Sequence, residues 1–532
     1  MSQVLMGPVL LEFTVPTLEF KLLAPVVLVL LAACLGILAE AALPRHYRFA
    51  AQLGLAFGSL LVALGFAVAN WRKGGVGVLA MGSITLDGPT HATWVLLLVF
   101  GLLSICLFAE RKLNGGTSAF CASGASVPGS PAEREATAAR FEHTEVFPLA
   151  LFAIGGMMIF AAANDLITMF VALEVFSLPL YLLCGLARRR RLLSQEAALK
   201  YFLLGALSSA FFLFGIALLY GYSGSFELAA IDTAMLTPSY GRGLLIAGIA
   251  LLAIGFLFKV GAVPFHTWTP DVYVGAPTAV TGFMAIATKA AAMIALARVF
   301  FVALGGARWD WQPLLAIIAV ITMGVGGVIA ITQNDVKRML AYSSITHAGF
   351  MLTALAGANA IGNGQVPGQL GSVASILFYL AGYGFATLGS FAILTMVRNA
   401  AGGEATGLGA WAGLGRRNPF LAATFSVFLL SFAGIPLTAG FLGKWVVFAA
   451  AWRGGYWWLV PIGIVMSLIA AAFYLRVILV MFFTEPSEDA EVGDASWLTW
   501  VPIVVGLAGT LALGIVPGTV MELLAKAGEF LR

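Results

Sequence analysis

Long apolar runs recur along the whole chain and are separated by short polar segments. Most are close to the ~20 residues that an α-helix needs to cross a bilayer. They are apolar all round rather than on one face, and they lack the alternation that is typical of barrel strands. The pattern predicts an all-α polytopic membrane protein with about 14 transmembrane helices. The runs fall at roughly 22–43, 48–69, 90–110, 146–163, 166–187, 196–222, 243–263, 276–303, 313–333, 336–357, 370–397, 418–451, 457–484 and 497–520.

The composition agrees with a membrane protein. Hydrophobic residues make up 61% of the 532 residues and charged residues only 10%, whereas about a quarter of a soluble protein is charged. The net charge of +4 is scattered and gives no reason to expect nucleic acid. The four cysteines form no CxxC pair and the five histidines form no HExxH motif, so we expect no metal site. The start of the chain, with Glu12 and Glu19, does not resemble a cleaved signal peptide.

Basic residues in the loops predict the orientation of the spans, because cytoplasmic loops are rich in Lys and Arg. One alternating set of loops carries most of them, and the run Arg188–Arg191 belongs to this set. We therefore expect these loops to be cytoplasmic and both termini to lie outside. The arginine run is interpreted as a topology anchor in preference to a lipid or partner site. The acidic loop 485–495 does not change this orientation, since acidic residues count little in the rule.

Two short motifs recur at nearly the same offset and indicate an internal repeat. NDLITM at 164–169 and NDVKRM at 334–339 are 170 residues apart, and Pro264 and Pro436 are 172 apart. A unit with an odd number of spans places its second copy upside down. We therefore predict two inverted five-helix repeats, with helices 7 and 12 broken at the two prolines, which is a transporter design.

The repeat and the loops set the expected division of the chain. It comprises an N-terminal three-helix segment (1–112), a flexible cytoplasmic loop (113–142), a first five-helix repeat (143–304), a second, inverted repeat (305–484), and an acidic loop with a C-terminal helix (485–532).

Ionisable residues within the apolar runs are the candidate functional groups. A charge in hydrocarbon costs several kcal/mol, so such residues mark ion or proton pathways by default. Five of them are candidates, and the competing interpretation is a set of inert ion pairs. Arg298 and Arg476 lie nearer helix ends, where we expect the side chains to reach the interface, and Lys200 could do the same. The five candidates are Glu174, Lys200, Lys259, Lys289 and Lys444.

A proton path can use such lysines. Burial favours the neutral form of a lysine, and a nearby carboxylate favours the charged form. The hypothesis is that Glu174 sets the proton affinity of either Lys200 or Lys259, and that Lys289 and Lys444 relay the proton onward. Two histidines in the same region, His266 and His347, are equally consistent with proton relay and with helix packing.

Longer stretches of the sequence resemble a known family. They include NDLITMFVALEVFSLPLYLLCGL, KYFLLGALSSAFFLFG, GFLFKVGAVPFHTWTPDVYVGAPTAV, KRMLAYSSITHAGFML and AGIPLTAGFLGKW. These are similar to the antiporter-like subunits of the proton-pumping NADH:quinone oxidoreductase, respiratory complex I, over most of residues 90–484. PDVYVGAPTAV and Lys444 favour the N-type branch over the M-type branch. The alternatives are a subunit of a Mrp-type cation/proton antiporter and a structural membrane subunit with inert charges.

The resemblance implies further properties. In that family, the positions matching Glu174, Lys200, Lys259, Lys289 and Lys444 form a buried axis, which the positions matching His266 and His347 line. No cofactor is then expected in this chain, and FMN and iron–sulfur clusters are expected in partner subunits. The implied partners are M-type and K-type membrane neighbours, the hydrophilic redox arm, membrane lipids and protons, with quinone bound elsewhere in the complex. The implied location is the plasma membrane of a bacterium.

Overall fold

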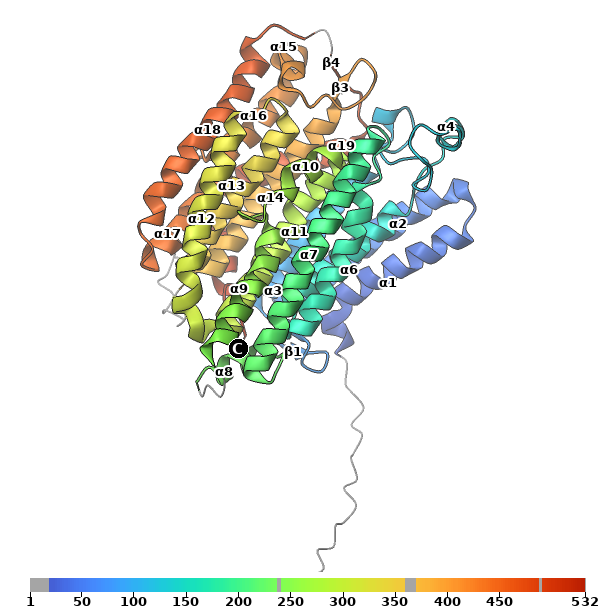
Figure 1. The fold of residues 1–532 in the computed structure, drawn as a ribbon. Helices are drawn as coiled ribbons and strands as arrows, with labels where there is room; N and C mark the ends of the chain where they lie inside the picture. Colours follow the sequence, from blue (N-terminus) through green and yellow to red (C-terminus); the bar gives the residue numbers. More distant parts are fainter. Residues whose placement is uncertain (1–18, 237–240, 359–369, 488–489, 532) are drawn as a thin grey trace, which may run out of the picture.

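Helices run side by side along most of the length of the molecule (Figure 1). The computed structural model describes residues 19–236, 241–358, 370–487 and 490–531. The start of the chain, including Glu12, lies outside the described residues, as do residues 488–489 of the acidic loop. Both ends of the described chain lie at the lower end of the bundle in Figure 1, whereas α4, α15, β3 and β4 lie at the upper end.

The helices in chain order are α1 Phe20–Ala42, α2 Arg45–Arg72, α3 Gly88–Phe108, α4 Pro131–Ala138, α5 Val146–Ala162, α6 Leu166–Cys184, α7 Arg191–Ser223, α8 Leu228–Ala234, α9 Arg242–Val260, α10 Trp268–Gly275, α11 Thr278–Arg298, α12 Arg308–Ile331, α13 Val336–Ala356, α14 Ser372–Met396, α15 Leu414–Arg417, α16 Pro419–Ala433, α17 Ala439–Arg453, α18 Leu459–Phe483, α19 Trp497–Ile515 and α20 Gly518–Lys526. The strands are β1 Gly77–Leu79, β2 Ile84–Leu86, β3 Val397–Asn399 and β4 Ala490–Val492. β1 pairs antiparallel with β2, and β3 with β4.

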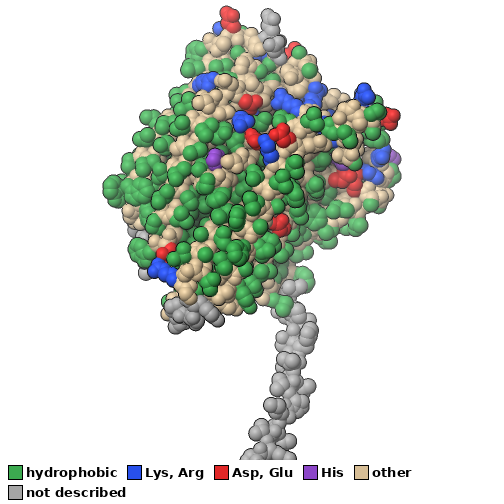
Figure 2. Space-filling model, viewed as in Figure 1, with side chains coloured by type: hydrophobic (Ala, Val, Ile, Leu, Met, Phe, Trp, Pro, Cys, Tyr) green, Lys and Arg blue, Asp and Glu red, His purple; other side chains and the backbone are tan. Residues whose placement is uncertain are grey.

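The prediction of an all-α polytopic membrane protein is confirmed. Among the described residues, twelve helices are long and apolar enough to cross a membrane, and α5 and α16 are shorter apolar helices. The exact count of 14 spans stays a prediction. In Figure 2, hydrophobic side chains cover most of the visible middle of the bundle, and charged side chains gather mainly towards its two ends. This distribution suits a molecule whose middle faces lipid.

Three helices form the centre of the bundle. α11, α13 and α14 are almost entirely buried, whereas α2 and α18 are mostly exposed. α11 packs against α14, α3, α5 and α9, and α13 packs against α12, α17 and α10. A helix that is apolar all round is expected in such a position. Polar side chains on these three helices are therefore shielded from lipid and from bulk water.

The chain breaks its helical path near both predicted prolines. α9 is followed by Gly261 (φ +79°) and α16 by Gly434 (φ +86°), each in the left-handed conformation that glycine adopts without strain. At each break, the backbone N–H of the next residue donates to a carbonyl five residues back. Because proline has no N–H, Pro264 and Pro436 then prevent the helix from restarting at once.

The second helices of the two predicted repeats, α6 and α13, begin alike. The carboxylates of Asp165 and Asp335 accept hydrogen bonds from the backbone N–H three residues on, at 2.7 and 2.8 Å, and so cap α6 and α13. The next residue in each case donates its N–H to a returning loop, at the carbonyls of Phe226 and Thr406. The equivalence supports an internal repeat, and its inverted arrangement stays a prediction.

The arginine run organises the loops at the upper end. Arg188 donates to the carbonyls of Ser118 and Phe141, and Arg191 pairs with Glu133 at 3.0 Å. Arg189 and Arg190 donate to carbonyls of the segment 401–404. The composition of residues 113–142 did not predict this arrangement, in which part of the segment forms α4 and several carbonyls are held by the run.

The expected position of the Arg298 side chain is wrong. The guanidinium does not reach the interface: only 1% of the side chain is exposed, and it pairs with Asp87 at 2.8 Å. Asp87 lies 211 residues earlier in the chain. A long-range partner makes burial of an arginine tolerable, and its presence could not be inferred from the position of Arg298 within its own helix.

Candidate functional site

Lys259 lies one residue before the end of α9 and is 3% exposed. Its Nζ donates a hydrogen bond of 2.7 Å to Oγ of Ser177 on α6. Four aromatic rings surround the ammonium group, with the centroids of Phe176 and Tyr201 at 5.2 and 5.4 Å. Such rings attract a cation through their faces, so the pocket can hold a charged lysine without a counter-ion in contact.

Glu174 shares a helix face with Ser177, because residues three apart on a helix are neighbours. Its Oε1 atom is buried and has no hydrogen-bond partner in the described part of the chain. Ser177 is the hydroxyl that Lys259 contacts, and its Oγ also donates to the carbonyl of Leu173. The carboxylate thus lies one helical turn from the partner of Lys259, and its Oε1 has no hydrogen bond to any described residue.

Lys200 has different carboxylate partners. Its Nζ pairs with Glu196 at 2.7 Å and with Asp271 at 2.8 Å, and 42% of the side chain is exposed. Arg338 joins the same cluster, 3.3 Å from Asp271. Of the two lysines left open as partners of Glu174, the structure therefore brings Lys259 to the helix face of the glutamate and places Lys200 in a surface ion-pair cluster.

Lys289 is buried at the centre of the bundle on α11, with 3% exposure. Its Nζ donates to the backbone carbonyl of Ser344 and, at 2.6 Å, to the Oγ of the same residue on α13. The hydroxyl of Tyr273 lies 3.4 Å from that Oγ. The ring of Tyr383 faces the ammonium group at 5.6 Å. Its hydrogen-bond partners, like those of Lys259, are uncharged.

His347 links three helices through two tyrosines. Its Nδ1 lies 2.6 Å from the hydroxyl of Tyr379 on α14, and its Nε2 lies 3.2 Å from that of Tyr474 on α18. Tyr474 also bonds Ser343, the neighbour of Ser344. A neutral imidazole has one N–H and one lone pair, so one hydroxyl accepts and the other donates. A chain of exchangeable protons therefore runs from Ser343 on α13 through Tyr474 and His347 to Tyr379 on α14.

Lys444 lies on α17, directly after the second break, and is 5% exposed. Its Nζ donates to the carbonyls of Phe432 (2.9 Å) and Ala433 (2.8 Å) and to Oγ of Ser467 (2.6 Å). The two carbonyls are the last of α16, where the helix dipole attracts a cation. The broken helix thus supplies the binding site for its own lysine, a use of broken helices known from transporters.

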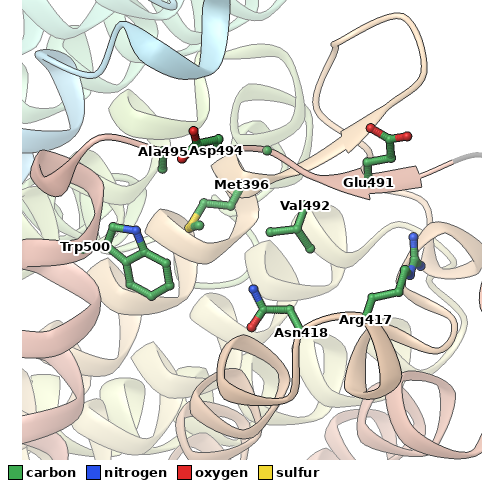
Figure 3. A pocket seen from close by; sticks show the side chains of 9 residues that line it. Met396, Arg417, Asn418, Glu491, Val492, Asp494, Ala495 and Trp500 are labelled. Carbon is green, nitrogen blue, oxygen red and sulfur yellow. The ribbon is translucent and has the colours of Figure 1, made fainter.

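A cavity of about 760 Å³ adjoins this lysine. It is lined by Lys444 and Ser467, by apolar side chains of α17 and α18, and by Arg453 and Leu370 at the end of the bundle where α17 finishes. A second cavity, of about 520 Å³, lies at the other end, between Met396, Asn418 and Trp500 (Figure 3). Of these two cavities, the first is lined by a predicted site residue and the second is not. A smaller cavity, of about 260 Å³, is lined by Lys200 and Asp271.

His266 lies in the first break, outside the lysine pockets. Its backbone carbonyl accepts from the N–H of Thr269, and its Nδ1 is buried without a partner in the residues that the structure describes. Lys259, Lys289, His347 and Lys444 therefore each contact hydroxyl groups of neighbouring helices. Lys200 pairs with carboxylates instead, and His266 lies apart from these contacts.

Hydroxyl groups complete the site, and sequence reasoning missed them. Lys259, Lys289 and Lys444 each contact a serine, and His347 contacts two tyrosines. The hydroxyl groups are those of Ser177, Ser344, Ser467, Tyr379 and Tyr474. Serine and tyrosine are common in membrane helices, so only their contact with a buried cation identifies them. Within the described residues, no three His, Cys, Asp or Glu side chains are placed to hold a metal ion.

The fold and these buried lysines define a class: multi-pass α-helical membrane proteins with ionisable groups in the hydrocarbon region, as in ion and proton pathways. Residues 163–470 match the family described as "NADH:quinone oxidoreductase/Mrp antiporter, TM". NADH-quinone oxidoreductase subunit N of Cutibacterium acnes is 52% identical, covering 99% of this chain and 98% of that protein. Subunit N of a Nocardioides species is 53% identical, covering 98% and 100%.

Solved structures agree with the sequence matches. A chain of respiratory complex I from Thermus thermophilus is 33% identical, with a TM-score of 0.74, covering 95% of this chain and 100% of that chain. A chain of the Mrp complex from Dietzia sp. has a TM-score of 0.77 at 20% identity, covering 96% and 97%, and so shares the fold. The chain belongs to the NADH:quinone oxidoreductase/Mrp antiporter membrane family and, within it, to the NADH-quinone oxidoreductase N subunits.

Proposed function

We propose that this chain is a proton-translocating membrane subunit of an NADH:quinone oxidoreductase, in which electron transfer from NADH to quinone in other subunits drives proton transfer through this one. One observation carries the proposal: Lys259, Lys289 and Lys444 are buried, and all their hydrogen-bond partners are uncharged. A buried charge without a contacting counter-ion is expensive, so such a lysine is suited to gaining and losing a proton.

The geometry suggests roles for the individual groups. Lys259 receives a proton and Glu174 controls its release from one helical turn away. Lys289 holds the proton at the centre, through Ser344. His347 and its two tyrosines pass it between α13, α14 and α18, and Lys444 delivers it to the adjoining cavity. Lys200 and His266 act, in this account, at the edge of the path rather than in it.

The alternative, inert ion pairs, fits the contacts less well. An inert buried charge needs a partner of opposite sign, and Arg298 has one in Asp87. The three lysines have hydroxyls and carbonyls instead. The protein therefore contains both arrangements, and the contrast favours a transport role for the lysines.

The relatives also suggest partners and location. We infer that the chain works in a bacterial plasma membrane beside M-type and K-type membrane subunits and a hydrophilic redox arm. FMN and iron–sulfur clusters reside in that arm, and the quinone binds elsewhere in the complex. The basic upper end, with Arg188–Arg191, faces the cytoplasm, so both termini lie outside. Exposed apolar side chains of α6 and α7, such as Leu178, Leu182 and Leu203, suit contact with lipid or a neighbouring subunit.

Two experiments test the proposal. The chain purified gently from its native membrane is expected to carry flavin and iron–sulfur absorbance, because the redox subunits travel with it. Purification with other antiporter subunits and without that absorbance would favour the Mrp-type alternative. Glu174→Gln in the intact complex is expected to reduce proton pumping in vesicles. Pumping equal to the wild type would contradict the role of Glu174.

A further inference from the structure

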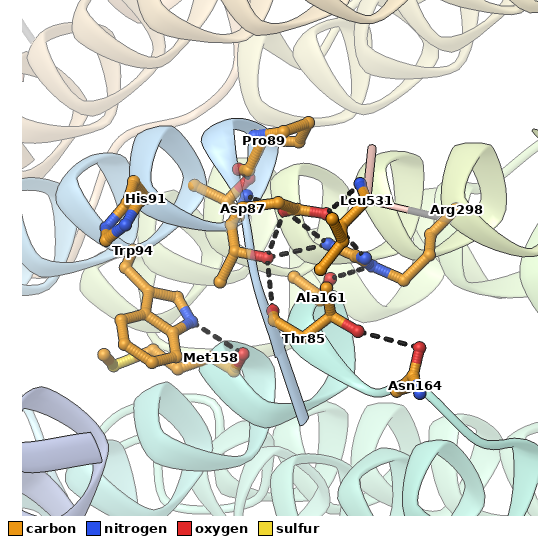
Figure 4. Close-up of polar contacts among 12 residues, drawn as sticks. Thr85, Asp87, Pro89, His91, Trp94, Met158, Ala161, Asn164, Arg298 and Leu531 are labelled. Carbon is orange, nitrogen blue, oxygen red and sulfur yellow. Dashed lines mark hydrogen bonds and ion pairs between the residues drawn. The ribbon is translucent and has the colours of Figure 1, made fainter. Parts of the chain in front are cut away.

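A second group of buried charges lies apart from the lysines, at the lower end of α11. Arg298 and Asp87 form a two-pronged ion pair, with Nη1–Oδ2 at 2.9 Å and Nη2–Oδ1 at 2.8 Å (Figure 4). Arg298 also donates to the hydroxyl of Thr90 at 2.7 Å and to the carbonyl of Ala161 at 3.0 Å. The side chains are 1% and 2% exposed. The pair thus ties together α3, the end of α5 and the end of α11.

The carboxylate of Asp87 is saturated with hydrogen bonds. Besides two from Arg298, it accepts the N–H and the hydroxyl of Thr90, at 3.0 and 2.8 Å, and the N–H of Leu531 at 3.2 Å. A carboxylate has about four lone-pair sites, and these five hydrogen bonds occupy them. A guanidinium group, for its part, does not release its proton in proteins. Neither partner can serve as a step in proton transfer.

The C-terminal end of the described chain covers the pair. The centroid of the Phe530 ring lies 4.7 Å from the guanidinium carbon of Arg298, and Leu531 lies beside the Asp87 carboxylate in Figure 4. Ala527 approaches so closely that a Cβ on Gly88 would lie 2.6 Å from its backbone. The cover is therefore packed against the start of α3, and water is kept from the pair on this side.

The pair stands on the helix that carries Lys289. Nine residues separate Lys289 from Arg298, a rise of about 13.5 Å along α11. The residues between them, 290–297, are all Ala, Met, Ile or Leu and are fully buried. A proton at Lys289 thus has no side-chain acceptor on α11 before it reaches the ion pair.

We propose that the Asp87–Arg298 pair is a proton-inert plug, which together with the apolar segment 290–297 keeps protons held at Lys289 from leaking to the lower end of the bundle along α11. The plug leaves the route across His347 to Lys444 and its cavity as the exit. This inference rests on the proposed function, since it assumes that Lys289 carries protons. Arg298 and Asp87 are positioning residues that close a path, not members of the path.

The test compares variants of the intact complex in proton-tight vesicles, with NADH oxidation and passive proton leak measured separately. Arg298→Gln frees lone pairs of a buried carboxylate beside the path, so the leak is expected to rise several-fold. Asp87→Asn removes the carboxylate whose lone pairs Arg298→Gln would free, so the leak is expected to stay at the wild-type level. A merely structural role predicts equal leaks, because each substitution breaks the same pair.

A matched control is the exposed pair Arg242–Asp310, joined at 2.7 Å. Arg242→Gln removes an ion pair at the same end of the bundle and is expected to leave the leak unchanged. Adding Lys289→Ala to Arg298→Gln is expected to abolish the extra leak. A leak that persists in this double variant would show a path independent of Lys289. Lys289→Ala alone tests the proposed function through its effect on pumping. A failure of the proposed function is therefore distinguishable from a failure of the plug.

Three results would overturn the plug. They are a wild-type leak in an assembled Arg298→Gln complex, equal leaks in Arg298→Gln and Asp87→Asn, and persistence of the leak in the double variant. Where Arg298→Gln prevents assembly, Arg298→Lys replaces it, because lysine keeps the charge and loses the two-pronged contact; its leak is expected to be intermediate. Failure of both Arg298 variants to assemble would assign the pair a structural role alone.

Discussion

Gly434 offers the sharpest test of the second helix break. Its φ of +86° is in the left-handed region, and a Cβ added there would lie 3.0 Å from Cδ and 3.2 Å from Nζ of Lys444. In Gly434→Ala, the backbone conformation costs about 1–2 kcal/mol. The methyl group also pushes the ammonium away from the two carbonyls that end α16. A hydrogen bond to a charged group contributes about 1.5–3 kcal/mol.

The expected result follows from these two costs. If Lys444 loses one of its two hydrogen bonds to the carbonyls that end α16, proton transfer is expected to slow by roughly tenfold or more, since 1.4 kcal/mol corresponds to a factor of ten. Proton pumping by vesicles that contain the variant complex is expected to fall by about that factor. Complex assembly, measured by native gel and flavin content, is expected to weaken only slightly.

The matched control is Gly455→Ala. Gly455 has nearly the same φ, +88°, and a Cβ there would meet nothing within 4 Å. It therefore carries the backbone cost without displacing a lysine, and its pumping is expected to match the wild type. Equal pumping by the two variants would refute the argument that the break positions Lys444.

Three further predictions concern other contacts. Ser177→Ala removes the hydroxyl that Lys259 contacts at 2.7 Å, and pumping in vesicles is expected to fall by about tenfold. Tyr474→Phe keeps the ring and removes a hydroxyl of the histidine relay, so pumping is expected to fall while assembly on native gels is retained. Arg191→Met releases the carbonyls and the carboxylate that it holds in residues 113–142; limited proteolysis is expected to cleave that segment faster, with pumping unchanged.

Each of these variants has a control of the same chemistry. Ser209 is a buried serine whose hydroxyl has no partner among the described residues, so Ser209→Ala is expected to pump normally. Tyr456→Phe removes the hydroxyl of a tyrosine outside the relay, and Arg134→Met removes an exposed arginine of α4. Equal pumping, or for the arginines equal proteolysis, by a control and its test variant would contradict the role assigned to that contact.

The sequence sufficed for much of the fold. All-round apolar runs placed most helices to within a few residues, because only helices satisfy their own backbone in lipid. Pro264 and Pro436 located both breaks, since proline cannot donate to a helix. Lys259, Lys289 and Lys444 were recognisable because a charge inside a long apolar run is rare. These are local signals, readable within one helix.

What the sequence could not supply depends on contacts between distant segments. Lys200 could not be separated from Lys259 as a partner of Glu174 until Asp271, 71 residues on, was seen to pair with Lys200. Arg298 was misplaced for the same reason, since its partner Asp87 lies 211 residues away. Serine and tyrosine partners carry no distinct local pattern, so they emerged only from three-dimensional contacts.

The lysine at the centre of the bundle provides the most direct test of the account. Lys289→Ala, in the intact complex reconstituted into proton-tight vesicles, removes the ammonium group between α11 and α13 and leaves the outer surface unchanged. Protons translocated per NADH oxidised are the quantity to measure, with Lys112→Ala, a surface lysine paired with Asp494, as the control. We predict a clear loss in the Lys289 variant and none in the control. An unchanged ratio in a fully assembled Lys289→Ala complex would contradict proton transfer through this chain.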